Sequence, residues 1–203
     1  MINTGVDDVT RRGSLRLLAG LMAVAAALSG CAHNQAASES LPSTSASASA
    51  STPALPPLGP KDLPMPAEAR TKDAAGAEAF VRYYIALINR TSKVMDAKPL
   101  RDFSQNCRDC NRIAANADKS ARSGYRYEGG EITVAEVAPP LVKDATSEMA
   151  IRVNQAKLTV LDASGNQVPE GNSNAFQGLT GSAALSWDPT MRSWLMTYMA
   201  FGR

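Results

Sequence analysis

The chain has 203 residues, 21 of them Lys or Arg and 19 Asp or Glu, and its formal net charge at pH 7 is +2. The charges include no long basic run, so the composition argues against nucleic-acid binding, which needs clustered positive charge to neutralise phosphates. The length allows one folded domain with a tail and excludes two substantial domains.

The N-terminus has the three regions of a bacterial export signal. A basic stretch with Arg11, Arg12 and Arg16 precedes an apolar run over residues 17–28. This run is too short to cross a hydrocarbon core of about 30 Å as a helix, and small residues follow it directly. We therefore expect residues 1–30 to be a signal peptide that is removed.

The segment Leu28-Ser29-Gly30-Cys31 resembles the lipobox of bacterial lipoproteins, which has an aliphatic residue, two small residues and a Cys. The resemblance implies that Cys31 becomes the new N-terminus and carries a diacylglyceryl group and a palmitate, which together give stable membrane anchoring. An ordinary secretory signal that happens to precede a Cys is the alternative. Residues 10–16 also resemble a twin-arginine signal, so the general and twin-arginine export routes both stay open.

Residues 31–72 are rich in Ser, Ala and Pro and contain little that a fold could bury. We expect them to form a disordered stalk with extended proline-rich stretches. Ser and Thr beside Pro are candidate sites for O-linked sugars. The lipid and the stalk together predict a domain, residues 73–203, that is held on the extracytoplasmic face of the cell membrane.

Three helices are predicted at the start of the domain. Apolar residues recur at helical spacing over residues 74–91, which predicts an amphipathic helix. Pro99 suits the first turn of a short helix over residues 99–103. A third helix is expected after Ser104 and ends near Ser123. Its inner side is expected to carry Ile113, Ala114, Ala117 and Ala121.

Antiparallel β-structure is predicted for the rest of the domain. Strands are expected over residues 131–138, 148–161, 176–187 and 193–200, because β-branched and apolar residues recur or alternate there. A change of phase near Gln155 or Ala156 predicts a β-bulge. In the last strand, Trp194, Met196 and Tyr198 are expected on one face. Helices that precede an antiparallel sheet define an α+β fold.

Several segments of the domain match the pattern of a known superfamily: Ala79-Phe-Val-Arg-Tyr-Tyr84, Pro99-Leu-Arg101 followed by Cys107-Arg-Asp-Cys110, Tyr127-Glu-Gly-Gly-Glu-Ile-Thr-Val134, and Trp187 with Trp194. With them, the domain resembles the nuclear transport factor 2-like, or cystatin-like, superfamily. It is most similar to an uncharacterised family of actinobacterial, mycobacterial-type cell-envelope lipoproteins. The resemblance implies a cone in which the first helix lies in the concavity of a curved antiparallel sheet, and it implies no activity.

Cys107-Arg108-Asp109-Cys110 is the sharpest local motif of the domain. In an exported domain, two thiols three residues apart at a helix start favour a short structural disulfide. A thioredoxin-like redox pair would need a βαβ order that is not predicted here, and a free reduced pair is the third alternative. Zinc needs four ligands, whereas the domain has no other Cys and no His, so neither a metal nor a cofactor is expected.

Catalysis in this domain would have to use a carboxylate as its base, because the only histidine, His33, lies in the stalk. By strict alternation Glu136 shares a face with Val134, and a candidate pocket of Glu136, Tyr84 and Trp194 would then lie in the cone. A bulge in the strand would instead turn Glu136 outward to the surface.

These observations favour a non-catalytic, lipid-anchored module of the cell envelope that holds an apolar small molecule or a protein partner in the cone of the fold. The alternative is a small-molecule isomerase or dehydratase that uses a carboxylate inside the cone. A scaffold or assembly factor whose sheet packs on another envelope protein is a further alternative. A cone filled with side chains would favour an interaction module, whereas a cavity with a buried carboxylate would favour an enzyme.

Overall fold

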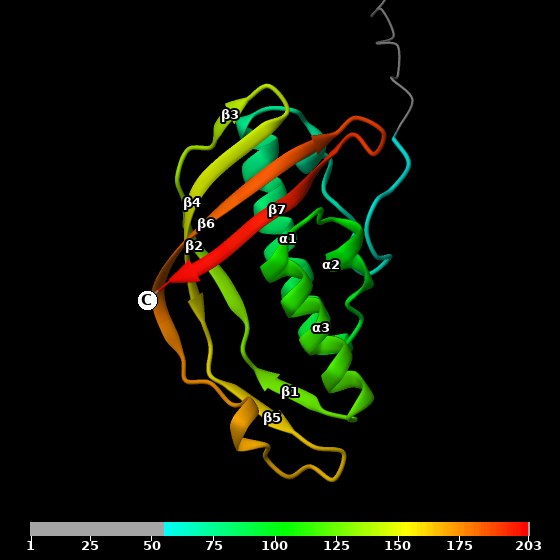
Figure 1. Cartoon of the computed structure of the whole chain (residues 1–203), viewed down its shortest axis with the longest axis vertical. Helices are drawn as coiled ribbons and strands as arrows, with labels where there is room; N and C mark the ends of the chain where they lie inside the picture. The colour runs from blue at the N-terminus through cyan, green and yellow to red at the C-terminus, as the bar shows by residue number, and fades with distance from the viewer. Residues whose placement is uncertain (1–54, 203) are drawn as a thin grey trace, which may run out of the picture. The chain divides into compact units, whose positions relative to one another are not determined.

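The computed structural model describes residues 55–202, so the predicted signal peptide, Cys31 and the stalk up to residue 54 lie outside the described residues. Helices come first and strands follow (Figure 1), which confirms the predicted α+β class. The helical elements are η1 (Ala67–Arg70), α1 (Ala74–Val94), α2 (Lys98–Asp102), α3 (Arg108–Arg122) and η2 (Pro169–Gly171). The strands are β1 (Arg126–Gly129), β2 (Ile132–Val137), β3 (Leu141–Lys143), β4 (Thr146–Gln155), β5 (Leu158–Leu161), β6 (Phe176–Asp188) and β7 (Ser193–Gly202).

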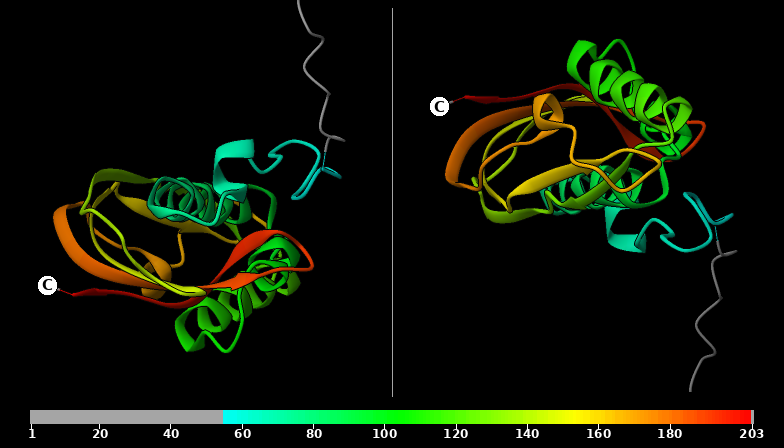
Figure 2. Two further views of the ribbon diagram at one scale, coloured as in Figure 1. Left: turned by 90° about the horizontal axis from the view of Figure 1, so that it is seen from above. Right: turned by 90° about the horizontal axis from the view of Figure 1, so that it is seen from below.

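The strands form two antiparallel sheets. The larger sheet has the order β2-β4-β6-β7. Strand β3 pairs with the same edge of β4 as β2 does, opposite to β6. Strands β1 and β5 form a separate two-stranded sheet. Seen along the long axis of the domain, the larger sheet curves round α1, and α3 lies beside β7 (Figure 2). In residues 55–202, no helix has the length and apolar character that a membrane span requires.

Three β-bulges bend the larger sheet. The extra residue is Ala135 on β2 and Thr197 on β7, and in the β4–β6 pair Gln177 and Gly178 of β6 lie opposite Asn154 alone. An extra residue in one strand bends that strand and increases its twist, so the three bulges account for the curvature. The bulge predicted near Gln155 is not in that strand, because the extra residue of the β4–β6 pair belongs to β6. The single strand predicted there is two strands, because the chain leaves the larger sheet and β5 pairs with β1.

Helix α1 supplies the centre of the core. The Asp73 carboxylate accepts a hydrogen bond from the Gly76 amide at 2.7 Å and caps the helix, and Met95 in the left-handed conformation ends it. The helix predicted over residues 74–91 is confirmed and continues to Val94. Its fully buried face packs on the concave side of the sheet and carries Ala77, Phe80, Val81, Tyr84 and Leu87.

Helix α3 begins at Arg108, a few residues later than predicted. Ala114 and Ala117 lie in the core as expected, but Ala121 is exposed and Ser120 takes the inner position. The Ser120 hydroxyl lies 2.7 Å from the Tyr127 hydroxyl on β1. A polar contact to the smaller sheet thus replaces the apolar contact that the alternation of alanines predicted.

Part of the segment that the sequence assigns to the stalk, from Leu58 onward, packs on the domain. Met65 and Ala69 belong to the buried core. The Arg70 guanidinium donates to the Pro56 carbonyl at 2.6 Å and to the Met191 carbonyl, in the β6–β7 turn, at 2.9 Å. The proline-rich composition predicted a stalk here, but a few apolar side chains and one arginine are enough to attach this segment to the domain.

Candidate functional site

The concave side of the sheet is filled with side chains. Phe80, Tyr84 and Trp194 are completely buried there. The Tyr84 hydroxyl donates to the Leu100 carbonyl at 2.9 Å, and the Trp194 indole donates to the Thr71 carbonyl at 2.9 Å. Burial raises the pKa of Tyr84 to about 12. Tyr84 therefore keeps its proton at neutral pH and serves the core as a hydrogen-bonded aromatic.

Glu136 lies on the opposite, outer side of the sheet. The bulge beside Ala135 reverses the alternation of β2, so the Glu136 side chain is 59% exposed and pairs with Arg152 on β4 at 3.3 Å. The structure therefore does not bring Glu136 together with Tyr84 and Trp194, and the candidate pocket of these three residues is not formed. The outward alternative for Glu136 is the one the structure shows.

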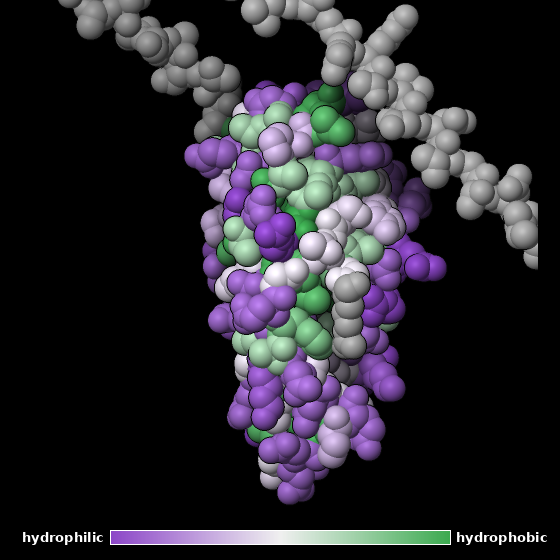
Figure 3. Space-filling model, turned by 90° about the vertical axis from the view of Figure 1, so that its left-hand side faces the viewer, coloured by the Kyte–Doolittle hydropathy of each residue, from purple (hydrophilic) through white to green (hydrophobic). Residues whose placement is uncertain are grey.

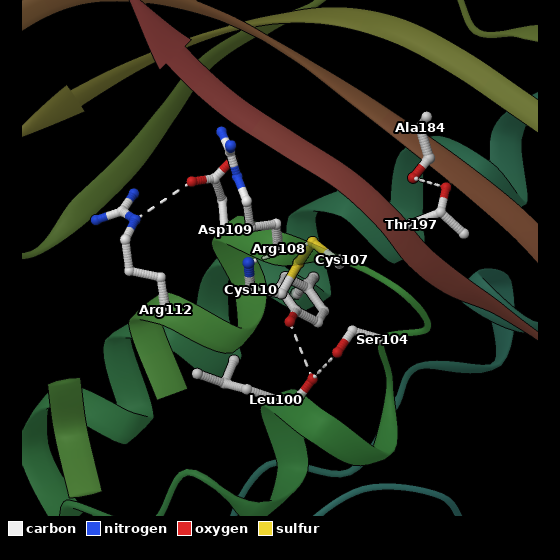
Figure 4. Close-up of a disulfide and its surroundings, with 10 residues drawn as sticks. Leu100, Ser104, Cys107, Arg108, Asp109, Cys110, Arg112, Ala184 and Thr197 are labelled. Atoms are coloured by element: carbon white, nitrogen blue, oxygen red, sulfur yellow. Dashed lines mark hydrogen bonds and ion pairs between the residues drawn. A yellow bond between two sulfur atoms is a disulfide. The ribbon is translucent and has the colours of Figure 1, made fainter. Parts of the chain in front are cut away.

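Cys107 and Cys110 form a disulfide at the start of α3, facing β7 (Figure 4). Both residues are only 1% exposed. The Cys107 sulfur also accepts a hydrogen bond from the Cys110 amide at 3.2 Å and so takes the place of an N-cap side chain. An attacking thiolate has to reach one of the sulfurs for thiol exchange, and this burial favours a structural role over a redox role.

A large hollow lies on the outer face of the larger sheet, a face that none of the helices in residues 55–202 covers. Its volume is about 730 Å³, within the range of small-molecule and peptide sites. We call it the outer hollow. Figure 3 shows one side of the domain, where apolar and weakly polar side chains form a band between hydrophilic ones. The residues that line the outer hollow are Ala138, Pro139, Leu141, Glu148, Met149, Ala150, Ser182, Ala183, Ala184 and Tyr198.

The pairing of the strands explains the shape of the outer hollow. In one row across the sheet, Ala138 pairs with Ala150, which pairs with Ser182, so the floor consists of very small side chains. In the next row the order is Leu141, Glu148, Ala184 and Tyr198. Large side chains at both ends of this row and small ones beside it make a shallow apolar depression.

Tyr198 reaches the outer hollow because of the bulge beside Thr197. The alternation of β7 places Trp194 and Met196 inside, and the extra residue then moves Met199 inside and Tyr198 outside. Tyr198 is 48% exposed and Leu141 is 76% exposed. The prediction that Trp194, Met196 and Tyr198 share one face is therefore wrong for Tyr198, because strict alternation does not continue through a bulge.

The other large hollow lies beside the segment that enters the domain. It has a volume of about 540 Å³ and is bordered by Pro57, Gly59 and the charged residues of the α1–α2 region. Its carboxylates already have partners, since Asp96 pairs with Arg90 and Asp102 with Lys98. Within residues 55–202 no group of three or more His, Cys, Asp or Glu side chains could hold a metal ion. The outer hollow is therefore the better candidate site.

Sequence reasoning singled out Tyr198 but none of the other residues of the outer hollow. A usable signal exists in β4 and β6. Strands with one solvated face usually place polar residues on that face, whereas the outward positions here include Ala150 and Ala184. Small apolar residues at outward positions of two neighbouring strands predict an apolar patch on the outer face of the sheet.

The comparisons with known proteins identify the family. The model of a family of unknown function, DUF6318, matches residues 47–200. The chain belongs to this family. The DUF6318 match includes residues before the predicted domain start at residue 73, in agreement with the packed segment from Leu58 onward. No curated protein sequence matches the chain.

Solved structures with a similar arrangement cover most of the DUF6318 domain. The intermembrane space region of the chloroplast protein ARC6 is 16% identical with a TM-score of 0.47, over 64% of this chain and 95% of that chain. A nuclear transport factor 2-like superfamily protein from Salmonella enterica subsp. enterica serovar Typhimurium str. LT2 is 11% identical with a TM-score of 0.39, over 64% and 92%. A cystatin-like domain of unknown function from Nostoc punctiforme PCC 73102 is 12% identical with a TM-score of 0.38, over 63% and 77%.

At these identities and TM-scores the likeness is one of architecture and carries no activity to this chain. The resemblance to actinobacterial lipoproteins stays a prediction.

Proposed function

We propose that this DUF6318 protein is a non-catalytic docking module of the cell envelope. A lipid on Cys31 would hold it on the extracytoplasmic face of the cell membrane, and the outer face of its larger sheet would bind an envelope protein. The observation that carries this proposal is the pairing of a filled concave side with an open apolar hollow on the convex side.

The shape of the outer hollow supports a protein partner. Contiguous apolar surface that stays exposed on a soluble domain usually marks an interaction site. Leu141 and Tyr198 are exposed at the rim of the outer hollow, and the small floor residues Ala150 and Ala184 leave room for side chains of a partner. Exposed aromatic residues beside small ones are also typical of the anchor positions of protein interfaces.

The filled concave side weighs against the alternative of an isomerase or dehydratase. Such an enzyme would place a carboxylate and a proton donor round a substrate cavity. In this domain, Glu136 lies outside in an ion pair and Tyr84 is committed to the Leu100 carbonyl. The cone instead holds the hydrophobic core.

The docking surface can be tested by site-specific photo-crosslinking in intact membranes. A photoreactive phenylalanine analogue at Tyr198 should yield a discrete protein adduct, and the same analogue at Val94, an exposed apolar residue of α1, should not. Ala184→Arg should remove the Tyr198 adduct because it fills the floor of the outer hollow. Equal adducts at both positions, or a Tyr198 adduct that survives Ala184→Arg, would count against this surface.

The anchor needs a separate test because Cys31 lies outside the described residues. Cys31→Ala should move the protein from the membrane fraction to the soluble fraction, and the intact mass of the unaltered protein should include acyl chains on residue 31. An unacylated mature terminus would refute the membrane anchor but would not affect the evidence for the docking surface.

A further inference from the structure

Resting on the proposed function, we infer that the outer hollow receives an arginine side chain, with an apolar neighbour, from a segment of the partner protein. The inference starts from Glu148, which lies in the lining of an otherwise apolar depression. Within residues 55–202, Glu148 has no ion-pair partner. A carboxylate in such a place attracts a cationic group that brings apolar surface with it.

The other charged residues described on this face do not pair with Glu148, so a cation for it would have to come from the partner protein. Glu136 and Arg152, two rows from Glu148 on the same face of the sheet, already pair with each other. Lys143, two residues beyond Leu141 on β3, forms no ion pair with Glu148 and is absent from the lining of the hollow. A second copy of this face would therefore bring another unpaired carboxylate into the contact and no unpaired cation from its own hollow. Charge complementarity favours a different protein.

The position of Tyr198 selects arginine over lysine. Glu148 pairs with Ala184, and Ala184 pairs with Tyr198, so the carboxylate and the ring flank one alanine methyl group on neighbouring strands. Strands lie about 4.8 Å apart, which puts the two flanking backbone positions roughly 10 Å from each other. A guanidinium above Ala184 can hydrogen-bond to the carboxylate while its flat face stacks on the aromatic ring.

The remaining wall accommodates the apolar neighbour of this arginine. Pro139 and the 76% exposed Leu141 border the hollow on the side of β3, and Ala138 and Ala150 form the floor beside them. An aliphatic side chain next to the arginine would cover these groups and exclude water from the ion pair. The preferred segment thus combines one arginine with an adjacent aliphatic residue.

The inference can be tested by NMR on the full chain with Cys31→Ala and labelled alanine methyl groups, because Ala150 and Ala184 report directly from the floor. The probe is acetyl-leucyl-arginine amide. Its matched controls are the citrulline peptide, which keeps the shape without the charge, and the glutamate peptide. We expect the arginine probe to shift the two floor methyl signals, and the citrulline peptide to bind about two- to fivefold more weakly, the range of an exposed ion pair.

Two variants identify the groups responsible. Glu148→Gln should remove the preference for arginine over citrulline, and Tyr198→Leu should weaken both peptides. Glu136→Gln, which alters a paired carboxylate on the same face, should leave the preference unchanged. All three positions are exposed, so the dispersion of the core methyl signals should show that each variant is folded.

The opposing outcomes separate this inference from the proposed function. Equal binding of arginine and citrulline peptides, stronger binding of the glutamate peptide, or no shift at the floor methyl groups would overturn the arginine site. The crosslinking result at Tyr198 would still stand by itself. Floor methyl shifts caused by phosphatidylglycerol–phosphatidylethanolamine vesicles in place of the arginine probe would assign the face to a lipid surface and would also overturn it.

Discussion

Reduction of the Cys107–Cys110 disulfide should destabilise the domain measurably even though the closed loop is short. The two cysteines are three residues apart, so the bond closes a loop of four residues. The loop-closure entropy for that length is roughly 6 cal/mol/K, which corresponds to about 2 kcal/mol at 298 K. For a domain of this size the same free energy lowers the melting temperature by about 4 to 8 °C.

The assay is equilibrium urea unfolding followed by tryptophan fluorescence, with and without a reducing agent. Trp187 and Trp194 lie with their ring centroids 5.3 Å apart in the larger sheet, so their emission reports global unfolding. A Cys107→Ala, Cys110→Ala double variant is the control, and its midpoint should not respond to the reducing agent. Because both sulfurs are buried, reduction in native buffer should be much slower than in urea.

Identical midpoints for the oxidised and the reduced protein would refute the structural role of the disulfide. Rapid and reversible reduction of the folded protein would refute the burial argument and would favour the redox alternative instead. Either result would also require a different explanation for the start of α3, where the Cys107 sulfur acts as the cap.

Three further predictions concern the core, the entering segment and the pH range. Phe80→Ala should lower the free energy of unfolding by about 3 to 5 kcal/mol in urea titrations, because Phe80 is fully buried on α1; a loss below about 1 kcal/mol would contradict the filled cone. Gly59→Ala should lower the urea midpoint, because φ at Gly59 is +91° and a Cβ would lie 2.1 Å from the Tyr83 hydroxyl. Gly202→Ala is the control and should leave the midpoint unchanged, because no atom lies within 4 Å of a Cβ built there. Burial raises the pKa of Tyr83 and Tyr84 from 10.0 to about 12, so their contribution to stability is complete below pH 10 and is lost as the pH rises to 12. The free energy of unfolding should fall by about 1.4 kcal/mol per pH unit for each tyrosine in this range. Tyr84→Phe should halve this dependence in unfolding measured at different pH values, and an unchanged dependence would contradict the assignment.

The helices could be predicted from the sequence because their signals are local. The apolar spacing of α1 and its capping residue Asp73 lie within a few residues of each other, and Pro99 marks the start of α2. The order of helices before strands then determines the α+β class. None of these inferences requires knowledge of which residues meet across the domain.

The outer hollow could not be predicted because it depends on two bulges and on strand pairing. A bulge shifts every later side chain of its strand to the opposite face. Thr197 therefore decides the side on which Tyr198 lies, and Ala135 decides the side of Glu136. Bulges arise where neighbouring strands adjust to each other, and this adjustment leaves little trace in the residues of one strand.

The entering segment was missed for a related reason. Its composition is that of a disordered linker, and only its contacts with distant residues show that it is folded. Arg70 is central to these contacts, because its guanidinium binds the carbonyl of Pro56 and that of Met191 at the same time.

Such an arrangement has a mechanical consequence. A pulling force applied at the N-terminal side would reach Pro56 first and would pass through Arg70 into the turn between β6 and β7. The load would therefore enter the domain at one corner of the sheet, through the turn that joins two of the strands that form the outer hollow. A protein tethered in this way could transmit tension from its anchor to the surface that it presents.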